Sequence, residues 1–455
     1  MNFFGPLIAL IFISLAVRLL LNNANPHATL LTLGILMIII SSILNLETPL
    51  PKITSGNKFL DFFKLIKESF SQTNAGIGLM IMTIGGFVSY IDHIGASSTL
   101  VQLSIKPLSI FKNKPHLICA ILIPIGQILF ICIPSAAGLG LLLMASVFPI
   151  LTNLGVSRLS AASVITACTS LGVGPASVIT TKASEILNLS VINYFIKLQI
   201  PVIIPLSLIL SVSFYFTNKY FDSKQNLIIH KEQIKNLTLI KRPKIYSIIP
   251  LLPLILLISF SELFNFFKNP IVLDTTTAMI ISLFIAMVFE FFRLKKINLV
   301  LNSLKVFWNG MGNIFKSVVT LIVSAKIFSD GLKSLGSIDA LLYLSQNIGL
   351  GAIGIAIIMI ILIFSASIIM GSGNASFFAF SPLTSKISNS FDVSNSLFIL
   401  PMNLSASMGR TLSPISGVLI AVSEIAEVSP IDIAKRNFIP IFITFVFLLI
   451  LNFLL

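Results

Sequence analysis

The sequence predicts an all-α polytopic membrane protein with about ten transmembrane helices and two re-entrant hairpins, arranged as two inverted-topology repeats. Three observations indicate this fold class: an apolar composition, uncharged runs long enough to cross a bilayer, and a segment that occurs twice. Of the 455 residues, 56% are hydrophobic and 10% are charged, and the mean hydropathy is +1.01. Because a soluble domain carries about 25% charged residues, the composition indicates an integral membrane protein.

The internal repeat joins residues 164–201 and 403–440, which superpose when the chain is shifted by about 239 positions. The shift aligns Pro175 with Pro414, and a Ser-Glu-Ile run and an Ile-Pro pair also coincide. Prolines and a Ser-Glu pair are not general lipid-facing residues, so we interpret the match as a true repeat. Two similar halves around one central site are typical of secondary transporters.

Uncharged apolar runs of about 18 or more residues predict the spans along the chain. In the first half they lie near 3–21, 28–46, 76–94, 158–187 and 191–217, and in the second half near 246–265, 271–292, 311–330, 394–424 and 430–453.

Two further apolar stretches, about 115–153 and about 351–388, are predicted to be re-entrant hairpins. Each is too long for one span, and small residues interrupt it at Pro134–Gly140 and Gly371–Ser376. Non-helical backbone at membrane depth requires protein or a watery cavity to satisfy its polar groups. The hairpin tips therefore predict a central cavity.

An odd number of spans per half gives the second copy the opposite polarity, so we expect the repeat to be inverted. The expected organisation is a first repeat over 1–217, a basic cytoplasmic linker over 218–245 and a second repeat over 246–455, with both termini periplasmic. The stretch 47–75 is expected to be an amphipathic interfacial segment outside. The net charge of +14 is mostly this topology signal and indicates no nucleic-acid partner.

Each repeated segment contains a second break, at Gly172–Pro175 in the helix of about 158–187 and at Gly409–Pro414 in the helix of about 394–424. Proline removes a helix hydrogen bond and glycine loosens the backbone, so both helices are expected to open near mid-membrane. Half-helix N-termini present free N–H groups and a positive dipole end, which suit an anion.

Arg410 indicates the sign of the ligand. An arginine at membrane depth costs at least ~2.5 kcal/mol, so it is retained for a partner or a pathway. Its counterpart in the first copy is Leu171, and a guanidinium prefers a bidentate carboxylate. The alternative is a structural ion pair with Glu424 or Asp432.

Lys326 and Asp330 lie four residues apart, and the simplest expectation is that they pair with each other. The cysteines and histidines lack the spacing of a metal site, so we expect no cofactor, and a coupling ion, H⁺ or Na⁺, is left open. The expected substrate-binding residues lie at the hairpin tips and helix breaks: Arg410, Thr411, Ser413, Ser372, Gly373, Asn374, Ser135, Gly138, Gly174 and Ser177.

At these positions the chain resembles a known family. Four segments closely resemble the anaerobic four-carbon-dicarboxylate carriers of the DcuC type: Ser135–Met144, Gly155–Arg158, Gly371–Ser376 and Gly409–Gly417. The resemblance implies a multi-pass carrier of the bacterial inner membrane for succinate, fumarate, malate or aspartate, which mainly exports succinate during anaerobic growth. It also implies kinship with the ion transporter superfamily, whose members pair two hairpins, move by an elevator mechanism and are usually homodimers.

Three other functions remain open from the residues. A related transporter could carry another anionic metabolite or an amino acid. A membrane-embedded enzyme would need a catalytic constellation at depth, and no such motif is visible in the sequence. A channel would need a selectivity filter, and an inverted repeat with one arginine favours alternating access instead.

Overall fold

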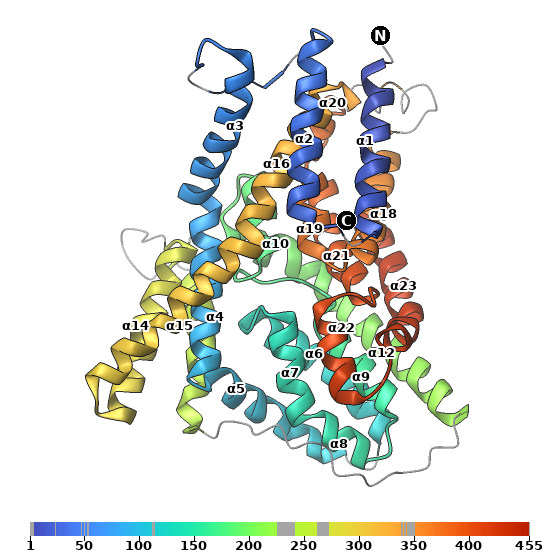
Figure 1. Cartoon of the computed structure of the whole chain (residues 1–455). Helices are drawn as coiled ribbons and strands as arrows, with labels where there is room; N and C mark the ends of the chain where they lie inside the picture. Colours follow the sequence, from blue (N-terminus) through green and yellow to red (C-terminus); the bar gives the residue numbers. More distant parts are fainter. Residues whose placement is uncertain are drawn as a thin grey trace.

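Every described element of regular secondary structure is helical, which confirms the predicted fold class (Figure 1). The computed structural model describes residues 4–22, 24–46, 48–49, 51, 54–111, 114–224, 242–261, 273–337, 340, 343 and 351–454. Most of the predicted linker 218–245 lies outside these residues.

The first half of the chain contains helices of very different lengths. They are α1 (Phe4–Leu21), α2 (Pro26–Ile43), α3 (Lys58–Thr73), the π turn η1 (Asn74–Gly78), α4 (Leu79–His93), α5 (Ala96–Ile105), η2 (Lys106–Phe111), α6 (Pro115–Cys132), α7 (Ala136–Ser146), α8 (Phe148–Asn153), α9 (Arg158–Ala167), α10 (Val178–Ile186), α11 (Val191–Asn193), the π turn η3 (Tyr194–Gln199) and α12 (Ile200–Lys224).

The second half follows a similar order. Its elements are η4 (Lys244–Leu251), α13 (Leu252–Ser259), α14 (Thr275–Leu294), α15 (Ile297–Ile314), the π turn η5 (Phe315–Val319), α16 (Thr320–Ser334), α18 (Ala352–Met370), α19 (Gly373–Phe380), η6 (Ser381–Leu383), α20 (Thr384–Ser390), α21 (Ser396–Thr411), α22 (Gly417–Ala426) and α23 (Pro430–Leu454).

Eight helices of the described chain are long and apolar enough to cross a membrane. They are Pro26–Ile43, Lys58–His93, Pro115–Cys132, Val191–Lys224, Thr275–Leu294, Ile297–Ser334, Ala352–Met370 and Pro430–Phe453. The set differs from the expected spans in a consistent way. Four expected spans drop out: both broken helices, because each arm is short, and the spans 3–21 and 246–265, where the apolar helices Phe4–Ala16 and Lys244–Ser259 are shorter than 18 residues. The first arms of both predicted hairpins enter because they reach 18 and 19 residues.

Two long helical units, Lys58–His93 and Ile297–Ser334, correspond under the same shift of about 239 positions, and each contains a π turn. Residues 58–73 of the stretch expected to be interfacial form α3, which packs against α16. There α3 continues through η1, with a kink at Gly76, into α4. An amphipathic pattern fits the wall of a protein as well as it fits a membrane surface, so sequence could not separate the two.

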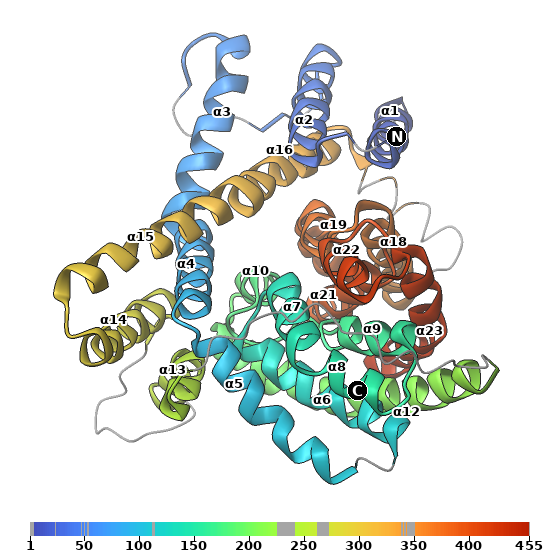
Figure 2. The same cartoon turned by 60° about the horizontal axis from the view of Figure 1, so that its bottom comes forward.

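These long units form one body of the molecule together with α2 and α14 (Figure 2). α15 packs against α4, and α16 packs against α2. The second body holds the predicted hairpins and broken helices, with α6 to α10, α12, α18, α19 and α21 to α23 (Figure 2). Small polar side chains fill its interior on α9 and α21, where they allow close helix approach: Ser160, Ser163, Thr166, Asn403, Ser405, Ser407 and Thr411 are buried.

A buried ionic cluster around Asp222 fastens four helices of the second body together. The Asp222 carboxylate accepts hydrogen bonds from Ser157 Oγ and Ser160 Oγ, each at 2.7 Å. It also lies 3.1 Å from His116 Nε2 and 3.4 Å from Arg436 Nη1. Asp222 and Arg436 are 4% and 5% exposed, so each charge depends on the other for compensation.

We predict that Asp222→Asn destabilises the protein by about 3 kcal/mol, because it leaves the Arg436 charge buried without a counter-charge. The measurement is the thermal unfolding midpoint in detergent. Asp432→Asn is the matched control, since Asp432 is 53% exposed and lies 3.9 Å from the exposed Lys435. An equal decrease of the unfolding midpoint in both variants would contradict the stabilising role of the buried cluster.

Candidate functional site

The two helix breaks lie at the centre of the second body. Residues 168–177 are non-helical between α9 and α10, so the first break includes the predicted Gly172–Pro175. The second break covers 412–416, because α21 continues through Arg410 and ends at Thr411. The sequence predicts that this break begins at Gly409, but the helix continues to Thr411. Arg410 therefore lies in the last turn of an intact helix.

Both predicted hairpin tips place a serine at the N-cap of the short helix that follows. Ser135 Oγ accepts a hydrogen bond from the Gly138 N–H at 3.2 Å, and Ser372 Oγ accepts one from the Ala375 N–H at 3.3 Å. N-cap side chains satisfy one of the free N–H groups that a helix start exposes. These two hydroxyls are thus used within the protein, and the adjacent N–H groups are what the tips offer to a ligand.

Close backbone approaches bring the second tip and the two breaks together. A methyl group added to Gly373 would lie 2.7 Å from the carbonyl oxygen of Ala406, so the tip rests directly on α21. A methyl group on Gly172 would lie 2.2 Å from Ser407 Oγ, so the first break touches the same helix. Asn374 is half-buried beside Gly373.

The first tip lies beside the first break. Pro134 and Pro175 line the same small apolar cavity, and Gly174, with φ +98°, contacts Ile131 of α6. Ser177 stands at the N-cap of α10, where its side chain makes no capping hydrogen bond.

Arg410 links the two breaks to each other. Its Nη2 donates a hydrogen bond to the Thr169 carbonyl oxygen, and its guanidinium carbon lies 5.8 Å from the centre of the Phe130 ring. Within the described part of the chain Arg410 forms no ion pair. The expected structural alternatives do not reach it, because Glu424 is exposed and Asp432 pairs with Lys435.

Several buried polar atoms around Arg410 have no hydrogen-bond partner among the described residues. They are Arg410 Nε, Ser413 Oγ and Ser170 Oγ. Buried donors without partners are costly, and native proteins leave very few of them. A guanidinium N–H and two hydroxyls without partners can donate hydrogen bonds to the oxygens of a carboxylate.

Two amide side chains that sequence analysis missed hold the breaks in position. Gln199 Oε1 accepts a hydrogen bond from the Gly174 N–H at 3.1 Å. Asn437 Nδ2 donates to the Thr411 carbonyl oxygen at 3.1 Å and also bonds Thr166 at 3.0 Å. The sequence contained a usable signal. Gln199 directly precedes the Ile-Pro pair of the first copy, and Asn437 lies two residues before the Ile-Pro pair of the second copy.

Asp92 is a third residue that sequence analysis missed. It lies in the last turn of α4, and its Oδ1 is buried without a partner among the described residues. Its Oδ2 would lie 3.6 Å from a methyl group on Gly138, so the carboxylate faces the first hairpin tip from the other body. An acid inside the apolar run 76–94 was the available signal.

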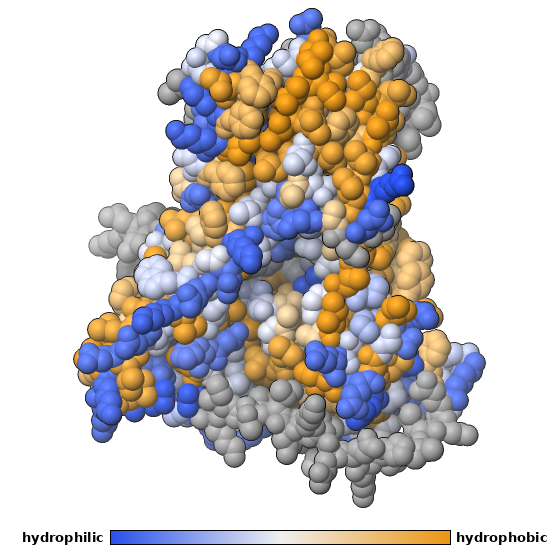
Figure 3. Space-filling view, in the orientation of Figure 1, coloured by the Kyte–Doolittle hydropathy of each residue, from blue (hydrophilic) through white to orange (hydrophobic). Residues whose placement is uncertain are grey.

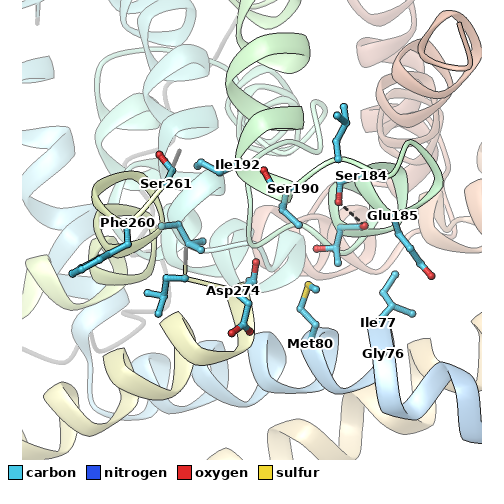
Figure 4. Close-up of a pocket in the computed structure, with 16 residues that line it drawn as sticks. Gly76, Ile77, Met80, Ser184, Glu185, Ser190, Ile192, Phe260, Ser261 and Asp274 are labelled. Carbon is cyan, nitrogen blue, oxygen red and sulfur yellow. Dashed lines mark hydrogen bonds between the residues drawn. The ribbon is translucent and has the colours of Figure 1, made fainter. Parts of the chain in front are cut away.

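Two larger cavities lie between the bodies. One, of about 420 Å³, is lined by η1, the end of α10 and the start of α14 (Figure 4). The other, of about 290 Å³, is lined by α3, α10, α16 and α19. Arg410 lines neither of them. Its side chain is half-buried, and its Nε is the buried atom.

Comparison with known proteins agrees with the architecture. The profile of the DcuC family, described as C4-dicarboxylate anaerobic carriers, matches residues 4–455. The Vibrio cholerae protein named "Probable anaerobic C4-dicarboxylate transporter DcuC" is 33% identical over 93% of this chain and 92% of its own length. The Escherichia coli anaerobic C4-dicarboxylate transporter DcuC is 30% identical over 99% of this chain and 96% of its own length.

Solved structures share the fold at low sequence identity. The Alcanivorax borkumensis YdaH transporter has a TM-score of 0.56 and 13% identity, covering 93% of this chain and 98% of that chain. Neisseria gonorrhoeae MtrF has a TM-score of 0.58 and 12% identity, covering 96% of this chain and 97% of that chain. The family and the named relatives are transporters, which excludes the membrane-embedded enzyme. This chain is therefore a multi-pass membrane transporter that belongs to the DcuC family of C4-dicarboxylate anaerobic carriers.

Proposed function

We propose that the protein is a secondary active transporter of four-carbon dicarboxylates such as succinate, fumarate, malate and aspartate. It works in the bacterial inner membrane, by succinate efflux or exchange under anaerobic conditions. The observation that carries the proposal is the Arg410 guanidinium, which lies at the junction of two helix breaks without a carboxylate partner among the described residues.

The substrate carboxylate completes this site. A planar guanidinium binds a carboxylate through two parallel hydrogen bonds, and the open Nε edge of Arg410 provides one of the donors. Ser413 and Ser170 supply hydroxyl donors beside it. The N-terminal N–H groups of α7, α10, α19 and α22 suit the other end of a dianion. The single arginine orients the substrate, because the first break has Leu171 at the corresponding position.

Alternating access follows from two inverted repeats. The matched long units, the matched capped tips and the matched breaks support a division into 1–217 and 246–455, with the tips entering from opposite faces. The second body then carries the site past the first body in an elevator movement, within a homodimer whose termini are periplasmic. The coupling ion, H⁺ or Na⁺, can be identified in proteoliposomes loaded with succinate. Uptake of labelled fumarate is measured with and without a gradient of each ion.

We predict that Gly373→Ala lowers transport at least about ten-fold, because the new methyl group meets the Ala406 backbone and pushes the second tip off α21. Labelled fumarate uptake in proteoliposomes is the measurement. Gly417→Ala is the control, since a methyl group there has no neighbour within 4 Å. If the Gly373→Ala protein takes up fumarate at the wild-type rate, transport does not require the close contact between the second tip and the Ala406 backbone.

We predict that Arg410→Lys raises the half-saturation concentration at least about ten-fold, and that Arg410→Ala nearly abolishes uptake. Lysine keeps the charge but loses the bidentate fork, and a charge-assisted hydrogen bond is worth about 1.5–3 kcal/mol. Smaller losses of binding free energy, about 0.5–1.5 kcal/mol each, are expected for variants that remove the side chains of Ser372, Asn374, Thr411 or Ser413. A well-expressed Arg410→Ala protein that transports succinate with unchanged affinity would remove the arginine from the binding site.

We predict that single cysteines at Ser135 and Ser372 react with impermeant thiol reagents from opposite faces of the membrane, and that substrate protects both. The native cysteines, Cys119, Cys132 and Cys168, are buried and are first replaced. Labelling of both positions from one face, without protection, would be incompatible with inverted hairpins.

A further inference from the structure

The cavity of about 290 Å³ lies where the two bodies meet. Its walls come from α3 and η1 (Gln72–Ile77), from α16 of the first body, and from α10 and α19 of the second body. α19 begins at the second hairpin tip, and α10 begins at the first break. Both walls on the second body are therefore direct extensions of the elements that form the candidate site.

Among the described residues, three lysines line this cavity, and two of them have an acidic partner there. Lys182 Nζ lies 2.8 Å from Glu185 Oε2, and Lys333 Nζ lies 3.6 Å from Asp330 Oδ1. Lys326 Nζ instead donates to the neutral Gln72 Oε1 at 3.0 Å. The expected Lys326–Asp330 pair is therefore wrong, because Asp330 pairs with Lys333 in the next turn and α3 supplies an amide to Lys326. The cavity keeps one excess positive charge.

Water reaches this side of the molecule. The neighbouring cavity of about 420 Å³ shares Gly76, Ile77 and Glu185 with it (Figure 4). Figure 3 shows a band of hydrophilic side chains across the middle of this face, with apolar surface above and below it. One helix face of α15 is polar and exposed over much of its length and continues into η5: Asn302, Lys305, Asn309, Asn313 and Lys316. Lipid-facing helices avoid such a stripe, so this face is hydrated.

We propose that the lysine cavity is a second, weaker binding site for dianions, in which Lys326 holds the dicarboxylate on its way to Arg410. The inference rests on the proposed function for the identity of the dianion. A positively charged, partly enclosed cavity raises the local concentration of an anion and its rate of entry. Its volume accommodates one small ligand. Because the walls belong to different bodies, movement of one body against the other opens or closes the site.

The test compares Lys326→Gln and Lys326→Arg in proteoliposomes, with KM and kcat for labelled fumarate measured at low and high ionic strength. We expect Lys326→Gln to raise KM about three-fold to ten-fold at low salt with kcat within about two-fold, and Lys326→Arg to resemble wild type. The difference shrinks at high salt, because screening weakens the field of the cavity. Lys435→Gln, on the exposed face of α23, is the matched control.

Unchanged KM in Lys326→Gln would overturn the proposal, and so would a lower kcat with unchanged KM, which marks a structural role. A separate binding measurement keeps the two hypotheses distinguishable. Saturation-transfer NMR with succinate should still detect binding to Arg410→Ala protein and lose it in Arg410→Ala/Lys326→Gln. If wild-type protein moves no four-carbon dicarboxylate, the proposed function fails, and this NMR comparison alone decides whether the cavity binds dianions. Equal NMR signals from both variants would refute the cavity site.

Discussion

The structure depends on how backbone polar groups are satisfied where helices end inside the membrane. Lipid offers no hydrogen bonds, so every free N–H and C=O at a tip or break needs a partner within the protein or in a watery cavity. Ser135 and Ser372 cap the short helices after the tips. Gln199 accepts a hydrogen bond from the Gly174 N–H, and Asn437 donates one to the Thr411 carbonyl oxygen. Arg410 satisfies the Thr169 carbonyl in the same way. The residues proposed to bind substrate therefore also hold the fold together.

The two halves solve this problem with similar backbones and different side chains. Both have a long helix with a π turn, a capped short helix and a break, but only the second break carries an arginine. Matched backbones give the central site two similar sets of free N–H groups. On the proposed function, the single cation makes the site directional, with one carboxylate of the substrate at Arg410 and the other toward the helix ends.

Features that depend on local sequence could be predicted, and features that depend on tertiary contacts could not. The apolar runs gave the helical membrane fold, and proline with glycine marked both breaks because these residues weaken helices wherever they occur. The repeat placed Arg410 at the second break, whereas its hydrogen bond to Thr169 of the first break is a tertiary contact that the sequence did not show. The partners of Lys326, Gln199 and Asn437 lie 254, 25 and 26 residues away, on other helices or, for Gly174, in a helix break. The sequence of the amphipathic α3 could not show its continuity with α4 or its packing against α16.

The buried Arg410 Nε, which has no partner among the described residues, has a consequence for transport. An open donor edge in a buried guanidinium raises the free energy of the empty site, and a bound carboxylate removes that cost. Arg410 also bridges the breaks through Thr169, so a ligand that engages the same guanidinium changes the contact between α21 and the first break. A ligand shifts a conformational equilibrium only by its differential affinity for the two states. Charge-assisted bonds of about 1.5–3 kcal/mol shift it roughly 10-fold to 150-fold. On the proposed function, the contact that recognises the dicarboxylate is thus also the contact through which binding biases the movement of the second body.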